Sequence, residues 1–241
     1  MAEIDLLDRY PKSSRPVEER GRRKLARSGW LSESEGANTN EDILLEQQLL
    51  EIVRQFGREY FDVDRLYGYG GYYYDPRFWS ETVKRFVEYY KLSANSSILD
   101  IGCAKGFLIY DIKRLYPQMV VAGLDISRYA IDQSIKEVSS FIKEGSAKAL
   151  PYGDNSFDLV VSINTVDHLP LKECKQAIKE IERVKKKHAF IMVNSWRDDE
   201  EKERLLKWNI TARTVMHVTE WKKLFAEVGY TGDYYWFFLQ K

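Results

Sequence analysis

The 241-residue sequence has few cysteines that could cross-link a small fold, and no excess of positive charge that would attract a polyanion. It contains two cysteines, Cys103 and Cys174, which are too few for a disulfide framework, so we expect a reducing, cytoplasmic setting. Lys plus Arg and Asp plus Glu both number 37, and the resulting zero formal charge argues against nucleic acid as a partner. No apolar run approaches the roughly 18 residues that span a bilayer, so no membrane partner is expected.

The N-terminal part is poor in apolar side chains. Residues 11–40 are rich in Arg, Ser, Glu and Gly, and this composition buries too little surface to offset the entropy of ordering. We therefore predict a flexible N-terminal arm over residues 1–40. Apolar residues at helical spacing begin after Glu41, and we predict that residues 41–95 form a helical cap in which two helices flank a segment rich in Tyr and Gly.

Residues 96–241 alternate between short apolar strands and amphipathic helices. Strands that are apolar on both faces and separated by helices indicate a parallel sheet covered on two sides. We predict one α/β domain with a doubly wound, mostly parallel sheet, to which the cap belongs. The turn at 231–233 is too short for a crossover, so we expect the last strand to be antiparallel. The predicted strands are 98–101, 119–124, 140–143, 157–163, 189–193 and 234–239, and the predicted helices are 107–115, 127–138, 171–184 and 221–228.

A glycine-containing turn joins the first of these strands to its helix in the segment ILDIGCAKGFLIYDI. In open α/β sheets, ligands bind beyond the carboxyl ends of the strands, where glycine lets the backbone approach and the next helix presents free N–H groups. Gly102 and Gly106 frame Cys-Ala-Lys, so the turn lacks the G-x-G-x-x-G signature of dinucleotide-binding folds. Its spacing from Asp100 onward resembles motif I of class I S-adenosylmethionine-dependent methyltransferases, D/E-x-G-x-G-x-G, with Ala104 in place of the middle glycine.

A second feature lies at the end of the second predicted strand. Asp125, in VVAGLDIS, comes 19 residues after Gly106. A carboxylate about 20 residues past such a loop can accept hydrogen bonds from both hydroxyls of a ribose. The alternative is that Asp125 merely precedes Ser127, an N-cap of the next helix. The carboxylate and the loop together favour cofactor binding.

The stretch EGSAKALPYGDNSFDLVVSINTVDHL resembles the same family from its third strand through its fourth. The most specific piece is L-P-[YF]-x-D-x-[ST]-F-D-x-V at 150–160, and the resemblance spans about residues 75–239. Within the family, the resemblance favours an uncharacterised bacterial type that methylates small molecules. The resemblance implies a Rossmann-like methyltransferase fold and S-adenosyl-L-methionine as cofactor. Ser146 and Ala147 would lie beside the adenine, and Asn164 near the methionine part. The cofactor-binding residues implied are Asp100, Gly102, Cys103, Ala104, Gly106, Asp125, Ile126, Ser146, Ala147 and Asn164.

The segment LYGYGGYYYDPRFW, residues 66–79, places aromatic rings on glycine-rich backbone. By the resemblance, elements that precede the first strand fold over the cofactor and help to close the substrate site. Aromatic faces attract a cationic sulfonium, and a closed cover excludes water from a methyl transfer. We predict a lid formed by Tyr69, Tyr72, Tyr73, Tyr74 and Trp79. The alternative is that these rings pack the N-terminal helices onto the sheet.

The candidate proton acceptor is His168, in NTVDHL after the fourth strand. Asp167 beside it could tune or share this catalytic role. The alternative is a loop histidine with no proton to move. Two adjacent residues supply too few convergent ligands for a metal, so no metal site is expected.

The motifs together predict an O- or N-methyltransferase acting on a small polar metabolite, with a sugar or surface-polysaccharide precursor among the candidates. Two alternatives stay open, namely methylation of RNA or protein, and a non-catalytic cofactor-binding partner subunit. The sequence NTVD at 164–167 differs from the Asn/Asp-Pro-Pro-aromatic motif of enzymes that methylate base amino groups, which weakens the first alternative. The retained Asp125 weakens the second. The motifs name neither the acceptor nor an oligomeric state.

Overall fold

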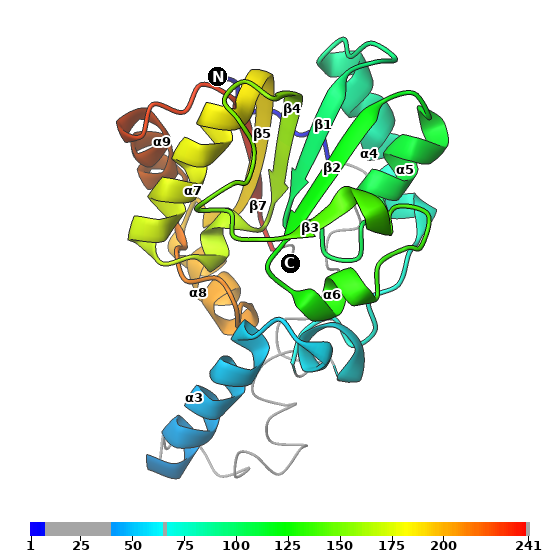
Figure 1. Ribbon diagram of the computed structural model, residues 1–241. Coiled ribbons are helices and arrows are strands. Elements are labelled where there is room, and N and C mark those ends of the chain that lie inside the picture. Colours follow the sequence, from blue (N-terminus) through cyan, green and yellow to red (C-terminus); the bar gives the residue numbers. More distant parts are fainter. Residues whose placement is uncertain (8–39, 65–66, 240–241) are drawn as a thin grey trace.

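The computed structural model describes residues 1–7, 40–64 and 67–239, with the side chains of 40–46 excepted (Figure 1). Within these ranges seven strands form one sheet in the order β3-β2-β1-β4-β5-β6, and β7 also pairs with β5. The doubly wound, Rossmann-like architecture predicted from the sequence is confirmed. The strands are β1 (Ser97–Ile101), β2 (Val120–Asp125), β3 (Ile142–Glu144), β4 (Phe157–Ile163), β5 (Lys185–Trp196), β6 (Met216–His217) and β7 (Asp233–Phe237).

All strand pairs in the described sheet are parallel, including β5 with β7. In that pair Phe190 lies opposite Asp233 and Asn194 opposite Phe237, so both strands run the same way. The antiparallel last strand predicted from the sequence is therefore wrong. The helix α9 (Val218–Glu227) carries the chain from β6 to β7 and forms the crossover, and the short turn is only the last part of that connection.

Helices cover both faces of the sheet (Figure 1). The helices α4 (Pro76–Tyr89) and α5 (Phe107–Leu115) pack on one face, and α7 (Leu171–Val184) and α9 pack on the other. Neighbouring residues of β4 face opposite layers, because Leu159 belongs to the core cluster under α4 and α5 whereas Val160 belongs to the cluster under α7 and α9. Burial on two sides explains why these strands read as continuous apolar runs.

The helix predicted over 127–138 is much shorter in the structure. Helix α6 spans Arg128–Asp132, with Ser127 as its N-cap. The chain then leaves the helical path, because the backbone N–H of Ile135 donates to the carbonyl of Lys105 at 3.1 Å. This tertiary bond ends the helix and fixes the loop that follows β1.

Residues 40–64 and 67–75, which we call the cap segment, lie below the carboxyl ends of the strands at the bottom of the view in Figure 1. Helix α3 (Asn40–Arg54) is followed by one π-helical turn, η1 (Glu59–Val63), and then by the segment rich in Tyr and Gly. Helix α4, which the sequence assigns to the cap, packs beside α5 on the sheet instead.

The first seven residues lie along the outer edge of β7. The backbone N–H of Ile4 donates to the carbonyl of Tyr234, and the N–H of Tyr234 donates to the carbonyl of Ala2, each at 3.0 Å. The leucines at positions 6 and 7 are buried in the core. The sequence predicts a flexible arm over residues 1–40, but its first seven residues belong to the packed body; residues 8–39 lie outside the described residues.

Three further elements complete the description. They are η2 (Ser139–Phe141), η3 (Val166–His168), which follows β4, and α8 (Asp199–Trp208), which follows β5. None of the helices in the described ranges is long and apolar enough to cross a membrane.

Candidate functional site

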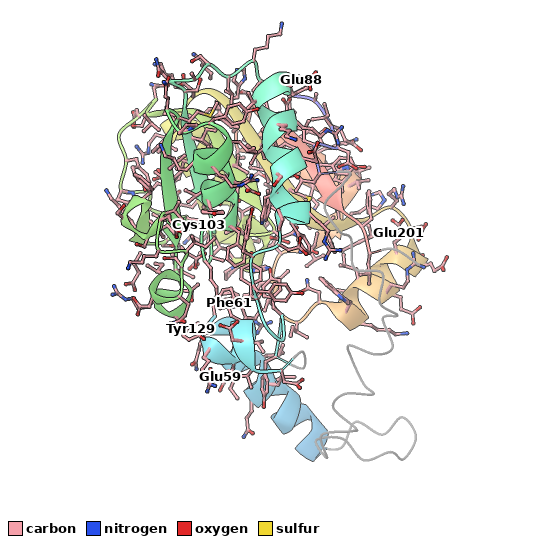
Figure 2. The ribbon with its side chains drawn as sticks, turned by 90° about the vertical axis from the view of Figure 1, so that its right-hand side faces the viewer. Glu59, Phe61, Glu88, Cys103, Tyr129 and Glu201 are labelled. Atoms are coloured by element: carbon pink, nitrogen blue, oxygen red, sulfur yellow. The ribbon has the colours of Figure 1, made fainter. Side chains whose placement is uncertain are left out.

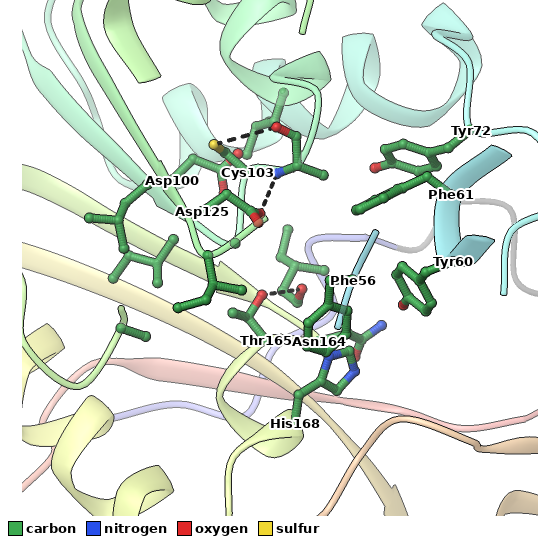
Figure 3. Close-up of a pocket in the computed structure, with 18 of the residues that line it drawn as sticks. Phe56, Tyr60, Phe61, Tyr72, Asp100, Cys103, Asp125, Asn164, Thr165 and His168 are labelled. Atoms are coloured by element: carbon green, nitrogen blue, oxygen red, sulfur yellow. Dashed lines mark hydrogen bonds between the residues drawn. The ribbon is translucent and has the colours of Figure 1, made fainter. Parts of the chain in front are cut away.

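A cavity of about 250 Å³ lies at the carboxyl ends of β1, β2, β3 and β4, between the sheet and the cap segment (Figure 3). The loops after these strands form one wall, and aromatic side chains of the cap segment face them. This is the position at which open parallel sheets bind ligands.

The structure brings most of the predicted cofactor residues together on the sheet wall. Of the predicted cofactor residues, those that line the cavity are Asp100, Gly102, Cys103, Ala104, Asp125, Ile126, Ser146, Ala147 and Asn164. Gly106 is the exception. It has φ +79°, and a Cβ there would lie 2.8 Å from Cδ1 of Ile142. Its glycine therefore serves the turn into α5 rather than direct contact with a ligand.

The loop after β1 depends on left-handed backbone at two further positions. Gly102 has φ +78°, and a Cβ there would lie 2.1 Å from Oγ1 of Thr165. Ala104 has φ +47°, a conformation that costs a residue other than glycine about 1–2 kcal/mol. This conformation explains why motif I has glycine at the position that Ala104 occupies in this chain. Alanine keeps the shape of the loop at a modest cost.

Backbone N–H groups hold both carboxylate oxygens of Asp125. The N–H of Ala104 donates to Oδ2, and the N–H of Ser127 donates to Oδ1, each at 2.7 Å. Burial raises the pKa of Asp125, and these backbone bonds oppose the rise. Each oxygen has a second lone pair, so the carboxylate can still accept hydrogen bonds from the hydroxyls of a ligand.

A second carboxyl group lies beside it at the end of β1. Burial, with a contribution from the charge of Asp125, raises the pKa of Asp100 to about 8. A positive charge placed nearby would favour the ionised form of Asp100. The sheet wall of the cavity is therefore suited to a cationic ligand.

Asn164, the first residue after β4, offers an unused acceptor. Its backbone is left-handed, with φ +48°, and its N–H donates to the carbonyl of Met192 at 2.8 Å. Its side-chain Oδ1 is buried and has no hydrogen-bond partner within the described residues. A buried acceptor of this kind is costly unless a donor satisfies it. The carboxylate of Asp125 and the amide oxygen of Asn164 thus place two hydrogen-bond acceptors on the same wall.

Aromatic rings of the cap segment face this wall (Figure 3). Phe61 lies 6.0 Å from Tyr69, 5.5 Å from Tyr72 and 6.4 Å from Tyr129, measured between ring centroids. Figure 2 shows Phe61 and Tyr129 beside each other, between η1 and α6. Three predicted lid residues, Tyr69, Tyr72 and Trp79, line the cavity.

The other two predicted lid residues lie elsewhere. Tyr73 is 75% exposed and does not line the cavity. The hydroxyl of Tyr74 donates at 2.6 Å to Oδ1 of the fully buried Asp111, which also accepts from Ser80. Burial and the bond to Asp111 raise the pKa of Tyr74 to about 12. For Tyr74 the packing alternative fits, because it anchors the end of the cap segment to α5.

Lys105, in the loop after β1, connects this loop to the cap segment. Its buried ammonium donates to the two carboxylate oxygens of Asp62 at 2.8 and 2.6 Å and to the carbonyl of Tyr72 at 2.8 Å. Asp62 also accepts from the N–H of Tyr72 and from the hydroxyl of Tyr129. Burial opposes the charged form of Asp62, but these bonds outweigh it and lower the pKa of Asp62.

Lys105, Asp62 and three aromatic residues upstream of the tyrosines also belong to this site and were not predicted from the sequence. Phe56, Tyr60 and Phe61 all contribute to the cavity. A lysine between two glycines of a buried loop requires an anionic partner, and this requirement was a usable signal. The aromatic residues of QFGREYF, just before the segment rich in Tyr and Gly, were another such signal.

His168 lines the cavity, whereas Asp167 does not. The imidazole of His168 stacks on Phe56 with 5.5 Å between centroids and 6° between planes, and its Nε2 lies 3.4 Å from Oγ1 of Thr211. Burial lowers the pKa of His168, and the charge of Asp167 opposes this effect. Asp167 itself is fully buried and accepts from the N–H of Asn194 at 3.1 Å, so its carboxylate braces η3 against β5.

Known proteins are similar to much of this chain. A family model described as a methyltransferase domain matches residues 92–234. A tRNA (carboxymethyluridine(34)-5-O)-methyltransferase of Arabidopsis thaliana is 32% identical over 141 residues, which cover 58% of this chain and 33% of that protein. A malonyl-[acyl-carrier protein] O-methyltransferase of Legionella pneumophila is 28% identical over 138 residues, which cover 56% and 47%. The chain thus spans less than half the length of these relatives.

Solved structures agree on the fold. The [4+2]-cyclase SpnF has a TM-score of 0.52 at 19% identity, over 76% of this chain and 67% of that one. The YcgJ protein of Bacillus subtilis has a TM-score of 0.50 at 17% identity, over 61% and 66%. The family model covers more than half of the chain and runs from just before β1 into β7, and so includes all the loops of the sheet wall. As the motifs predict, the chain belongs to the methyltransferase-domain family, whose class I fold uses S-adenosylmethionine as methyl donor.

Proposed function

We propose that this chain transfers the methyl group of S-adenosylmethionine to an oxygen or nitrogen atom of a small molecule bound under the cap segment. One observation carries the proposal: a single cavity joins the wall suited to the donor, with Asp125 and Asn164, to the rings of Tyr69 and Tyr72 and to His168. The donor supplies a methyl group already activated by positive sulfur. The chain is therefore required chiefly to align the two reactants and to exclude water.

On the sheet wall, Asp125 accepts from the ribose hydroxyls, and Asn164 accepts from the amino group of the methionine part. Ser146 and Ala147 contact the adenine. Gly102 lines the same cavity, and its lack of a side chain leaves room for Thr165 to pack against the loop that would contact the donor. The acceptor atoms of Asp125 and Asn164, placed around one cavity, support their roles, and the resemblance to the family supports those of Ser146 and Ala147.

His168 is the proposed base for an acceptor that holds a proton on its reacting atom. Because burial lowers its pKa, the imidazole is neutral at pH 7 and able to take a proton. Stacking on Phe56 fixes the plane of the ring at the cavity wall. Asp167 has an indirect role, because its carboxylate holds η3, the turn that carries His168, against β5.

The proposal favours small acceptors over RNA. One relative is named as a tRNA methyltransferase, but this chain covers only 33% of it. Zero formal charge gives the chain no general attraction for phosphate backbone. The cavity, at about 250 Å³ and roofed by rings, suits a compact molecule.

The test uses radiolabelled S-adenosylmethionine with separate pools of small metabolites, RNA and protein from a bacterial extract. We expect label in the small-molecule pool, and a loss of it with Asp125→Ala. Calorimetry should show donor binding weakened in that variant by about 1–3 kcal/mol, the scale for losing charge-assisted hydrogen bonds. Label only in RNA or protein would refute the small-molecule proposal, and donor binding without transfer to any pool would support the non-catalytic alternative.

A further inference from the structure

Two arginines from distant parts of the chain, Arg54 and Arg213, lie near enough for their charges to interact, and the first of them lines the cavity. Arg54 is the last residue of α3 and lines the cavity. Arg213 lies in the loop between α8 and β6, and its backbone N–H donates to the carbonyl of Asp167 at 2.9 Å, which holds the loop against η3. Ile210 of the same loop packs on the cluster formed by Leu49 and Val53 of α3. The loop therefore lies between α3 and the turn that carries His168.

No carboxylate among the described residues pairs with either of these two arginines. Burial, together with the charge of Arg213, lowers the pKa of Arg54, as expected for two cations held near each other. Within the described ranges, neither guanidinium forms an ion pair or a side-chain hydrogen bond. Guanidinium groups are the preferred partners of carboxylates and phosphates in proteins, because their planar fork matches two oxygen atoms at once.

The cavity is consequently polarised. Its sheet wall carries the carboxyl groups of Asp100 and Asp125, which suit the positive charges of the donor. The cap segment contributes Arg54 to the lining, with Arg213 close to it. Rings of Phe56, Tyr60 and other cap residues also line the cavity and offer apolar surface. A cationic acceptor would be repelled from the arginine side, whereas an anion would be attracted.

We infer that the methyl acceptor carries an anionic group, a carboxylate or a phosphate, that Arg54 and Arg213 bind, with its apolar or aromatic part against the rings of the cap segment. This inference rests on the proposed function, because it names the class of molecule that the same cavity methylates. The reacting oxygen or nitrogen atom then lies between the anionic end of the acceptor and the donor, within reach of His168. The two arginines determine specificity and take no part in the bond that forms.

The first experiment measures binding of four probes to the protein saturated with S-adenosylhomocysteine. The anionic probes are benzoate and phenyl phosphate, and the neutral probes are benzamide and phenol. We expect the anionic probes to bind more tightly, and Arg54→Gln and Arg213→Gln each to weaken them by roughly three- to tenfold, as for an exposed charge-assisted hydrogen bond. The preference between benzoate and phenyl phosphate identifies the anion. Arg128→Gln, which removes an exposed arginine on α6, is the control and should leave probe binding unchanged.

The second experiment passes the labelled small-molecule products through an anion exchanger at pH 8. Retained label supports the inference, and label that passes through with neutral and cationic compounds overturns it. Equal affinities for anionic and neutral probes, no binding of any probe, or equal losses in the Arg128→Gln control would also overturn it. Absence of methylated product from all pools contradicts the proposed function instead, so the two failures are distinguishable.

Discussion

The ammonium of Lys105 lies 2.6 Å from Oδ2 of Asp62, and this contact joins the loop after β1, on the sheet wall of the cavity, to the cap segment. Tyr72 is held between the same two residues, because its carbonyl accepts from Lys105 and its N–H donates to Asp62. The ring of Tyr72 lines the cavity. The position of Tyr72 in the cap segment is therefore linked directly to the loop after β1, which lines the same cavity.

Replacing Lys105 with Met should release this link. The remaining carboxylate of Asp62 loses its cationic partner in a largely buried place, and we expect the free energy of unfolding to fall by about 2–4 kcal/mol. Donor affinity should fall as well, since the loop and the roof lose their common anchor. Urea unfolding and calorimetry on the same protein measure the two effects. Lys84→Met, which breaks the exposed pair with Glu81, should cost at most ~0.5 kcal/mol and serves as control; equal effects in the two variants would contradict the link.

The lid hypothesis predicts different outcomes at neighbouring tyrosines. Tyr69→Ala and Tyr72→Ala should lower kcat/KM by about 10- to 100-fold, because water enters the cavity and the acceptor loses a contact surface. Tyr73→Ala should have little effect, since this ring is exposed and outside the cavity. Steady-state rates and melting temperatures measured on the three variants distinguish a lid from packing. Rates that stay intact while stability collapses at Tyr69 and Tyr72 would establish the packing alternative.

The loop after β1 allows a prediction for opposite substitutions. Gly102→Ala adds a Cβ in contact with Thr165 on left-handed backbone, so we expect a loss of several kcal/mol of stability and of donor binding. Ala104→Gly relieves about 1–2 kcal/mol of backbone strain but adds about 0.5–1 kcal/mol of unfolded-state entropy, and should be nearly neutral. Gly153→Ala, whose Cβ would meet Ser156 at an ordinary 3.6 Å, is the control. Denaturant unfolding and calorimetry of the three variants measure their stability and donor affinity, and we expect both to be lowest in Gly102→Ala. If Gly102→Ala is as stable as the other two variants and binds the donor as well, the prediction is wrong.

Donor binding should depend on pH through Asp100. In the free protein its pKa is raised to about 8, so the carboxyl group is mostly protonated at pH 7. A cationic donor favours the ionised form and lowers this pKa, so binding releases a proton. Affinity should rise with pH up to about 8, by at most about tenfold per unit, and then level off.

Calorimetry in buffers of different ionisation enthalpy counts the proton released. The effect should be larger for S-adenosylmethionine than for S-adenosylhomocysteine, which lacks the sulfonium charge. Asp100→Asn should abolish the proton release. If donor affinity is flat from pH 6.5 to 8.5 in the unmodified protein, Asp100 does not respond to the donor.

The sequence predicts the parts of this molecule that depend on local pattern. The apolar run at 157–163 and the helical spacing at 171–184 match β4 and α7 residue for residue. Gly102 and Asp125 reach the same cavity because the carboxyl ends of parallel strands meet at one edge of the sheet.

Long-range contacts account for what the sequence did not predict. The bond from Ile135 to Lys105 ends α6 early, and no periodicity within the helix signals it. The pairing of Asp62 with Lys105 joins residues 43 apart. Arg54 and Arg213 come near each other where Ile210, of the loop that carries Arg213, packs on α3. Tyr73 and Tyr74 differ from Tyr72 only in the direction of their side chains, which composition does not record.

The pairing of Ala2 and Ile4 with Tyr234 also bears on how the molecule behaves in concentrated solution. A free outer edge of β7 would present unpaired N–H and C=O groups, the usual template for joining sheets of separate molecules. Residues 1–7 occupy that edge with their own backbone. Their removal would open it, and the resulting defect would appear as self-association that grows with protein concentration.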